Sequence, residues 1–195
     1  QTAKQWREYR GKDCAIVFQD ALAALNPTLT VGRQIVEKLL VHTDMTREEA
    51  RREAVRLLEQ VGIPEAGRRV RQYPHEFSGG MRQRAMIAIA LACQPRLLIA
   101  DEPTTALDVT IQAEIIELLK QIQKETGMAV IMITHDLGIV ANIAKKIVVM
   151  YAGKVVETGS SADIFYSARH PYTRALLRAV PRLDLESGQE LESIE

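Results

Sequence analysis

Two adjacent carboxylates, Asp101 and Glu102, directly follow the apolar run Leu97–Ala100. A run so short and apolar, preceded by a Gln-Pro pair, is typical of a buried parallel strand. Ligands of open α/β sheets bind beyond the carboxyl ends of such strands. A metal ligand and a general base at that edge are the groups that nucleotide hydrolysis requires. Taken alone, the two acids are equally well explained as exposed residues of a turn.

Two further polar residues follow predicted strands. Gln19 ends the strand Ala15–Phe18, and His135 comes after the strand Ala129–Ile133 and Thr134. Alone, Gln19 is better explained as a polar residue at a strand end, and a single histidine is more often structural than catalytic. A neutral imidazole donates one hydrogen bond and accepts another, which suits positioning rather than bulk base chemistry.

The tripeptide Ser78-Gly79-Gly80 precedes a predicted helix over Met81–Leu91. Serine is a good N-cap, glycine lets a ligand approach the backbone closely, and free amides at a helix N-terminus attract anions. The tripeptide therefore indicates phosphate binding. An ordinary capped helix is the alternative, which the paired glycines make less attractive.

Composition limits the classes of protein to consider. The chain has 195 residues and a formal net charge of zero, which gives no reason to expect nucleic acid as a direct partner. The longest apolar run, Ala85–Cys93, has nine residues, whereas a membrane span needs about 20. The N-terminus is polar and shows no secretory signal. Cys14 and Cys93 have neither metal-ligand spacing nor a disulfide-rich setting, which fits a reducing cytosol.

Five motifs, in their order along the chain, resemble those of the ATP-binding cassette (ABC) ATPases: the Q-loop, the signature motif, Walker B, the D-loop and the switch histidine. In this chain they are Ile16–Gln19, Phe77–Arg84, Leu97–Pro103, Thr104–Asp108 and Thr134–Asp136. Each motif alone is a weak or moderate signal, and their shared order carries the resemblance. The usual Leu-Ser-Gly-Gly-Gln signature differs here only at its two variable ends.

The resemblance implies how the residues at the sheet edge act in hydrolysis. Glu102 would orient and deprotonate the attacking water. Asp101 would hold Mg²⁺ through water, since Mg²⁺ keeps several waters and takes one or two carboxylates plus phosphates. Gln19 would contact Mg²⁺ or the attacking water and link the catalytic core to transmembrane subunits. His135 would bond the γ-phosphate and sense its loss.

The resemblance also implies a second subunit. Ser78, Gly79 and Gly80 would contact the γ-phosphate of ATP held by the opposing subunit. Asp108, in the turn before a predicted helix over Ile111–Glu125, would lie at the contact with that partner. Asp108 also has a competing structural role as a helix cap, and both roles are compatible.

The fold implied is α/β: a partial P-loop NTPase (RecA-like) sheet with an α-helical subdomain. Residues 1–20 would end an N-terminal RecA-like part with the Q-loop, and residues 21–95 would form the helical subdomain with the signature motif. Residues 96–168 would carry Walker B, the D-loop and the switch histidine. Residues 169–195 would form a C-terminal extension, frayed from about Asp184.

Local patterns predict individual elements. A helix is expected over Val31–His42, and the capping box Thr46-x-x-Glu49 is expected to open another. These helices would dock on a coupling helix of a membrane subunit if the resemblance holds, and otherwise simply cover the core. Ile147–Tyr151 and Lys154–Thr158 are expected to form a hairpin, followed by a short helix.

A P-loop, Gly-x-x-x-x-Gly-Lys-[Ser/Thr], holds the phosphates in ATPases of this class, and none is found in the chain. In the family it precedes the Q-loop by several dozen residues, whereas this chain opens eighteen residues before Gln19. We therefore expect that the N-terminal P-loop part is missing by truncation. A natural protein without a P-loop is the alternative. In either case the chain alone is expected not to hydrolyse ATP.

The stretch His170–Leu177, together with Asn26–Thr30 and the signature Phe77–Arg84, narrows the resemblance to ATPase subunits of dipeptide, oligopeptide and nickel importers. It implies an ATP-binding and ATP-hydrolysing subunit that energises import of peptides or related solutes. ATP and Mg²⁺ would be its cofactors, and its place the cytoplasmic face of the membrane. Its partners would be a second ATPase subunit, transmembrane permease subunits and, indirectly, an extracytoplasmic solute-binding protein.

Two other readings remain at this point. A soluble ABC ATPase of DNA repair or translation would carry long coiled-coil or basic insertions, and the chain has neither. A non-catalytic docking module is supported only by the missing P-loop.

Overall fold

The computed structural model describes residues 2, 5–6, 9–105 and 107–179. The chain divides into two compact units, residues 1–133 and 134–195, and each is considered by itself. The four-part division predicted from the motifs follows a different criterion and stays a prediction. No helix among the described residues is long and apolar enough to cross a membrane. The tail from about Asp184, predicted to be frayed, lies outside the described residues.

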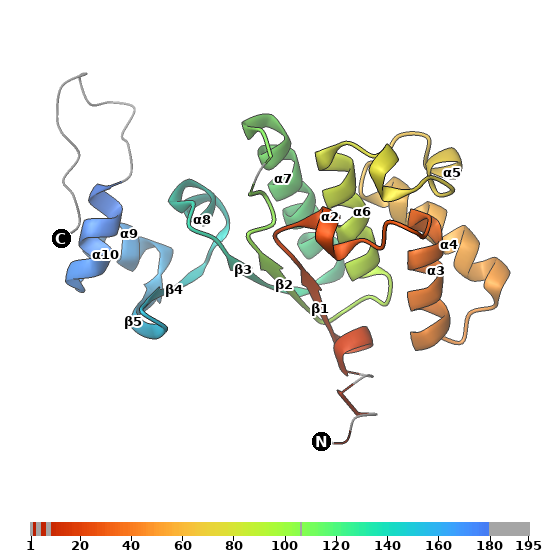
Figure 1. Cartoon of the computed structure of the whole chain (residues 1–195). Helices are drawn as coiled ribbons and strands as arrows, with labels where there is room; N and C mark the ends of the chain where they lie inside the picture. The colour runs from red at the N-terminus through yellow and green to blue at the C-terminus, as the bar shows by residue number, and fades with distance from the viewer. Residues whose placement is uncertain (1, 3–4, 7–8, 106, 180–195) are drawn as a thin grey trace. The chain divides into compact units, whose positions relative to one another are not determined.

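A three-stranded parallel sheet organises the first unit (Figure 1). Its strands are β1 (Cys14–Val17), β2 (Leu97–Asp101) and β3 (Ala129–Ile133), in that spatial order. The strands are all parallel, so their carboxyl ends share one edge of the sheet. The expected α/β sheet is thereby confirmed, and the residues after each strand leave from the same edge.

The two faces of this sheet differ in burial. Ala15 of β1 aligns with Leu98 of β2, and both are buried in the core with side chains of two long helices. These helices are α6 (Gly79–Leu91) and α7 (Val109–Thr126). On the other face, Ile16 is 45% exposed and Ile131 is 51% exposed. Parallel sheets normally carry a layer on both faces, and the described part of this unit supplies only one.

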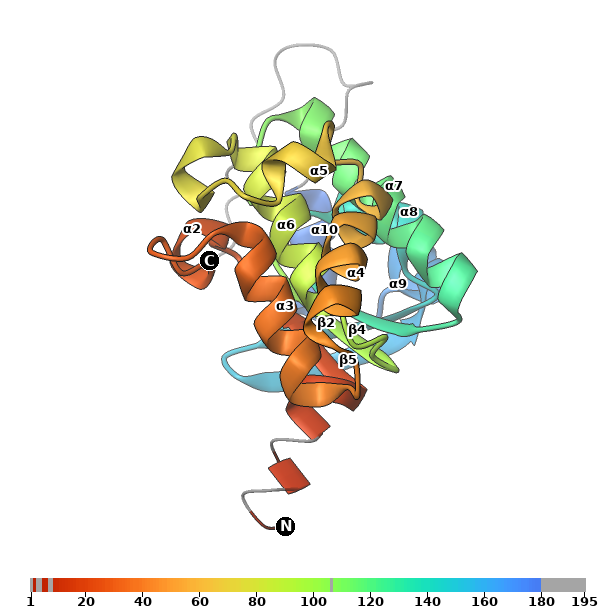
Figure 2. The same cartoon turned by 90° about the vertical axis from the view of Figure 1, so that its right-hand side faces the viewer.

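The segment of the chain between β1 and β2 is largely helical. It contains α2 (Ala21–Ala24), α3 (Val31–His42), α4 (Arg47–Gln60) and α5 (Ala66–Arg69). Figure 2 shows α3 and α4 running side by side. Helix α3 has the predicted bounds. The predicted capping box is confirmed: Glu49 N–H donates to Thr46 Oγ1 at 3.3 Å, and Thr46 N–H donates to Glu49 Oε2 at 2.7 Å.

The second unit is built on the predicted hairpin. Strands β4 (Lys146–Tyr151) and β5 (Lys154–Ser160) pair antiparallel. The turn between them has positive φ at both central residues, 48° at Ala152 and 75° at Gly153, which suits the right-handed twist of a hairpin. The described part of this unit, residues 134–179, also contains three helices: α8 (Leu137–Ile143), α9 (Ser161–Ser167) and α10 (Pro171–Arg178). Helix α9 is the predicted short helix.

Candidate functional site

The carboxyl end of β2 carries the two acids. Asp101 is the last residue of the strand and aligns with Ile133 of β3. Side chains alternate along a strand, so Asp101 shares the open face of the sheet with Ile99. Its carboxylate is half-buried at an edge where ligands of α/β sheets bind. An oxygen donor in that place fits the preference of Mg²⁺ for carboxylate, water and phosphate ligands.

Glu102 is held in a rare backbone conformation. Its φ is 44°, a value that is costly for a residue with a side chain and that clusters at functional sites. Its N–H donates to Ile133 O at 2.8 Å, and its Oε2 accepts from Thr105 Oγ1 at 3.0 Å. The backbone and the carboxylate are therefore both fixed. Sequence reasoning did not identify Thr105, although a hydroxyl three residues after the acid in a tight turn was a usable signal.

Asp108 caps α7, which confirms the structural role predicted for it as a helix cap. Its Oδ1 accepts from Ile111 N–H at 2.9 Å, and the side chain is exposed. The helix begins at Val109, two residues before the predicted start. An exposed cap remains available to a second subunit, so the predicted contact with a partner stays a prediction.

The signature tripeptide forms the start of α6. Ser78 is the N-cap, and its Oγ accepts from Met81 N–H at 3.3 Å. The helix begins at Gly79, so the two glycines belong to its first turn and do not precede it. The first amides of a helix have no acceptor within the helix. They are therefore suited to an anion, as the sequence predicted.

The two glycines differ in what surrounds them. A Cβ on Gly80 would lie 2.8 Å from Ile111 Cγ2 of α7, which no ordinary contact allows. A Cβ on Gly79 would lie 3.6 Å from Leu107 Cδ2, an ordinary contact. The absence of a side chain at Gly80 is therefore required by helix packing, whatever its role toward a phosphate.

Gln19 lies two residues beyond β1 and is exposed. Because β1 is parallel to β2, Gln19 follows its strand at the same edge of the sheet as Asp101. The next residue, Asp20, caps α2 by accepting from Leu22 N–H at 2.8 Å. Gln19 thus stands between a strand end and a helix cap. Its contact with Mg²⁺ or water stays a prediction.

His135 is the second residue of the second unit and lies two residues after the end of β3. The residues that flank His135 are hydrogen-bonded to each other, since Asp136 N–H donates to Thr134 Oγ1 at 3.0 Å. Asp136 Oδ1 in turn accepts from Gly138 N–H at 2.8 Å. The flanking residues therefore form a tight turn into α8. The bond from His135 to the γ-phosphate, which the resemblance implies, stays a prediction.

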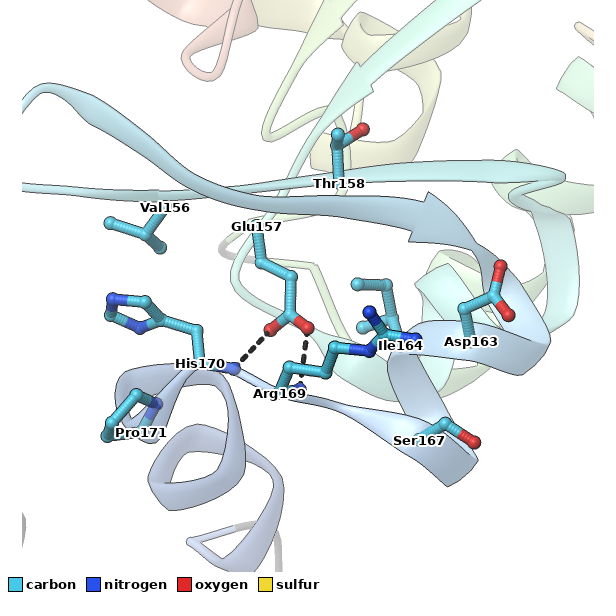
Figure 3. Close-up of a pocket in the computed structure, with 9 residues that line it drawn as sticks. All are labelled: Val156, Glu157, Thr158, Asp163, Ile164, Ser167, Arg169, His170 and Pro171. Atoms are coloured by element: carbon cyan, nitrogen blue, oxygen red, sulfur yellow. Dashed lines mark hydrogen bonds between the residues drawn. The ribbon is translucent and has the colours of Figure 1, made fainter.

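The His-Pro-Tyr-Thr stretch of the second unit lies beside a cavity of about 600 Å³ (Figure 3). His170 Nδ1 accepts from Tyr172 N–H at 3.2 Å and so caps α10. In the lining of the cavity, the Glu157 carboxylate accepts directly from the N–H groups of Arg169 at 2.7 Å and His170 at 3.2 Å. The Thr173 hydroxyl and these backbone groups hold the pKa of Glu157 below its usual value. The motif therefore anchors α10 to the hairpin.

Two family models match parts of this chain. The chain matches the model "ABC transporter" over residues 1–105 and the model "Oligopeptide/dipeptide transporter, C-terminal region" over residues 156–195. The chain therefore belongs to the ABC transporter family.

Curated relatives are named as ATP-binding proteins of transport or import. The chain is 59% identical over 192 residues to the dipeptide transport ATP-binding protein DppD of Bacillus subtilis, covering 98% of this chain and 57% of the relative. It is 56% identical over 191 residues to the oligopeptide transport ATP-binding protein OppD of the same organism, covering 98% and 53%. It is 57% identical over 188 residues to the glutathione import ATP-binding protein GsiA of Escherichia coli K12, covering 96% and 30%. The chain thus spans about half of the length of the two Bacillus relatives.

Solved structures give the same fold. The dimeric, post-hydrolysis state of the ATP-binding cassette MJ0796, bound to ADP and Pi, matches with a TM-score of 0.72 at 30% identity, covering 83% of this chain and 68% of that one. The cassette cbiO1 from Clostridium perfringens matches with a TM-score of 0.73 at 31% identity, covering 85% and 64%. The predicted fold class, a P-loop NTPase of the ABC type, is confirmed.

Proposed function

We propose that the protein is the ATP-binding and ATP-hydrolysing subunit of an ABC importer for peptides or related solutes, at the cytoplasmic face of the membrane. The observation that carries the proposal is the fixed Glu102 at the carboxyl end of a parallel strand, immediately after Asp101. The match of residues 156–195 to the oligopeptide/dipeptide transporter region favours an importer over a soluble ABC ATPase.

In this mechanism Glu102 accepts a proton from the water that attacks the γ-phosphate. Its rare φ and its bond from Thr105 Oγ1 limit the directions in which the carboxylate can point. Asp101 and Gln19 would hold Mg²⁺ with phosphate oxygens and waters, and the ion would neutralise charge on the phosphates. His135 would donate a hydrogen bond to the γ-phosphate from a neutral imidazole.

The helix start at Ser78, Gly79 and Gly80 would bind the γ-phosphate of ATP held by a second ATPase subunit. The exposed Asp108 would lie at the contact between the two subunits. Support comes from the amides of the first turn of α6 and from the dimeric state of the related cassette MJ0796. Closure and reopening of the pair would drive the permease subunits, with a solute-binding protein delivering cargo outside the cell.

A groove among α3, α4 and α5 is the proposed docking site for the permease. It has a volume of about 790 Å³. Apolar and basic side chains line it together: Val36, Leu40, Val55, Val70, Arg33, Arg47, Arg51 and Arg71. One carboxylate, Glu37, also lines it and pairs with Arg33 at 3.0 Å. The excess of basic over acidic side chains beside apolar ones suits a short amphipathic helix that carries acidic side chains.

The Glu102→Gln variant of the full-length protein tests the proposed hydrolysis. The amide keeps the shape and the bond with Thr105 but cannot take up a proton. We expect ATP binding to be retained and turnover to fall by about 100-fold or more, since a general base contributes about 10²–10⁴ in rate. Turnover at the wild-type rate in this variant would refute the role of Glu102.

A further inference from the structure

We propose that Gln112 is a positioning residue for the proposed hydrolysis, and that its side-chain amide fixes the backbone carbonyl groups of Thr104 and Leu107, which lie between Glu102 and Asp108 in the sequence. The inference rests on the proposed function of Glu102. Gln112 stands in the first turn of α7, is half-buried, and belongs to none of the motifs that the sequence analysis identified.

The Gln112 amide holds two backbone carbonyl groups at once. Its Nε2 donates to Thr104 O at 3.2 Å and to Leu107 O at 3.3 Å. A side-chain amide has two N–H groups, so both are used. Thr104 is only 4% exposed. Thr104 O also accepts from Leu107 N–H at 3.2 Å, so without Gln112 this carbonyl, which has little access to water, would lose one of its two donors.

A single peptide group connects this amide to Glu102. The carbonyl oxygen of Thr104, which Gln112 holds, belongs to the same planar peptide as the N–H of Thr105. That N–H donates to Glu102 O at 3.2 Å, and the Thr105 hydroxyl donates to the Glu102 carboxylate at 3.0 Å. Rotation of this peptide would therefore move both bonds that reach Glu102 from Thr105.

The second carbonyl connects the same amide to the signature helix. The Leu107 side chain lies 3.6 Å from the place of a Cβ on Gly79. One residue before Gln112, Ile111 packs against Gly80. Gln112 thus fixes the segment that contacts the signature glycines as well as the segment that orients the acid.

The test uses the full-length protein in its assembled transporter, with steady-state ATP hydrolysis as the readout. Gln112→Leu keeps the volume and removes both donors. Gln112→Glu keeps a polar side chain of the same length and also removes both donors, so it decides the question if the leucine variant does not fold. Gln112→Lys restores a donor, because an ammonium can serve two carbonyls, as Lys38 Nζ does with Ile89 O and Ala90 O in this chain. Gln121→Leu is the matched control, since Gln121 lies on the same helix and its side-chain amide donates to the exposed Glu125.

A misplacement of 1 Å at a reacting group costs about 100-fold in rate. For a loss of side-chain support, which moves Glu102 less than this, we expect kcat to fall about tenfold in Gln112→Leu and Gln112→Glu while KM for ATP stays within about twofold. Gln112→Lys should recover most of kcat, and Gln121→Leu should match the wild type. A merely structural role would lower the unfolding midpoint and the folded fraction, so kcat is expressed per folded, ATP-binding protein; on that basis a merely structural role would leave the donor-less variants at the wild-type kcat.

Two outcomes overturn the inference: wild-type kcat in a folded donor-less variant, or equal losses in the lysine and leucine variants. The Glu102→Gln result separates this failure from that of the proposed function. If Glu102→Gln abolishes turnover and the donor-less variants do not lower kcat, only the role of Gln112 is wrong. If Glu102→Gln hydrolyses ATP normally, the assignment of the base is wrong.

Discussion

Replacement of Gly80 by alanine should destabilise the protein even without nucleotide. The new Cβ would lie 2.8 Å from Ile111 Cγ2, whereas carbon atoms in good contact are about 3.5 Å apart. The two helices or the Ile111 side chain must therefore give way by about 0.7 Å, the difference between these distances. Overpacking of this kind costs about 1–3 kcal/mol, against a gain in helix propensity of at most about 1 kcal/mol.

Gly79→Ala is the matched control for this prediction. Its Cβ would make an ordinary contact of 3.6 Å with Leu107 Cδ2. It has a similar helix-propensity gain, so the difference between the two variants isolates the clash. We expect Gly80→Ala to be less stable than Gly79→Ala by about 1–3 kcal/mol.

Urea unfolding of the full-length protein in nucleotide-free buffer is the appropriate assay, since a shift in midpoint at constant m-value reports stability alone. Removing the opposing methyl group should relieve the clash. We therefore expect Gly80→Ala to cost less in an Ile111→Ala background, with a coupling energy of about 1–2 kcal/mol. Equal stability of the two glycine variants, or no coupling with Ile111, would refute the packing argument.

Three further predictions follow from single contacts. Thr46→Ala removes the cap of α4 and should lower the free energy of unfolding by about 1 kcal/mol, measured by urea unfolding; an unchanged midpoint would show that the cap contributes nothing. The pKa of Glu157 is lowered in the folded state, so its stabilising effect is present above its unfolded pKa and lost as pH falls through its folded pKa. The stability difference between wild type and Glu157→Gln should accordingly shrink in acid, and a difference independent of pH would contradict this. Arg51→Glu reverses one charge on the rim of the proposed docking groove and should weaken co-purification with the permease, whereas Arg68→Glu, outside the groove, should not; equal retention of both would exclude the groove as the docking site.

The arrangement of the sheet was predictable from local patterns. Short apolar runs ending in polar residues gave β2 and β3, and parallel pairing places their ends at one edge. The caps were predictable too, because Thr46 and Asp108 act through backbone groups three residues away. Strand ends and helix caps depend on a few neighbouring residues, so they can be predicted from the local sequence alone.

Features that depend on tertiary contact were not predictable in the same way. The positive φ of Glu102 accompanies its N–H bond to Ile133, which is distant in the sequence. Gln112 is one glutamine among several on a helix, and only the fold shows which carbonyl groups it reaches. Gly80 was assigned to ligand approach, and its contact with Ile111 became visible only when α6 and α7 were placed together.

These contacts join two functions that the mechanism assigns to different nucleotides. Glu102 would act on the ATP of its own subunit, while Gly79 and Gly80 would act on the ATP of the partner. Within one chain, the segment whose carbonyl groups Gln112 holds contacts Glu102 through Thr105 and Gly79 through the Leu107 side chain. A mixed dimer therefore distinguishes direct from transmitted effects: with Gly80→Ala in one subunit only, loss at a single nucleotide site would show that the glycine serves the phosphate alone. Loss at both sites is expected if the packed start of α6 and α7 moves as one body.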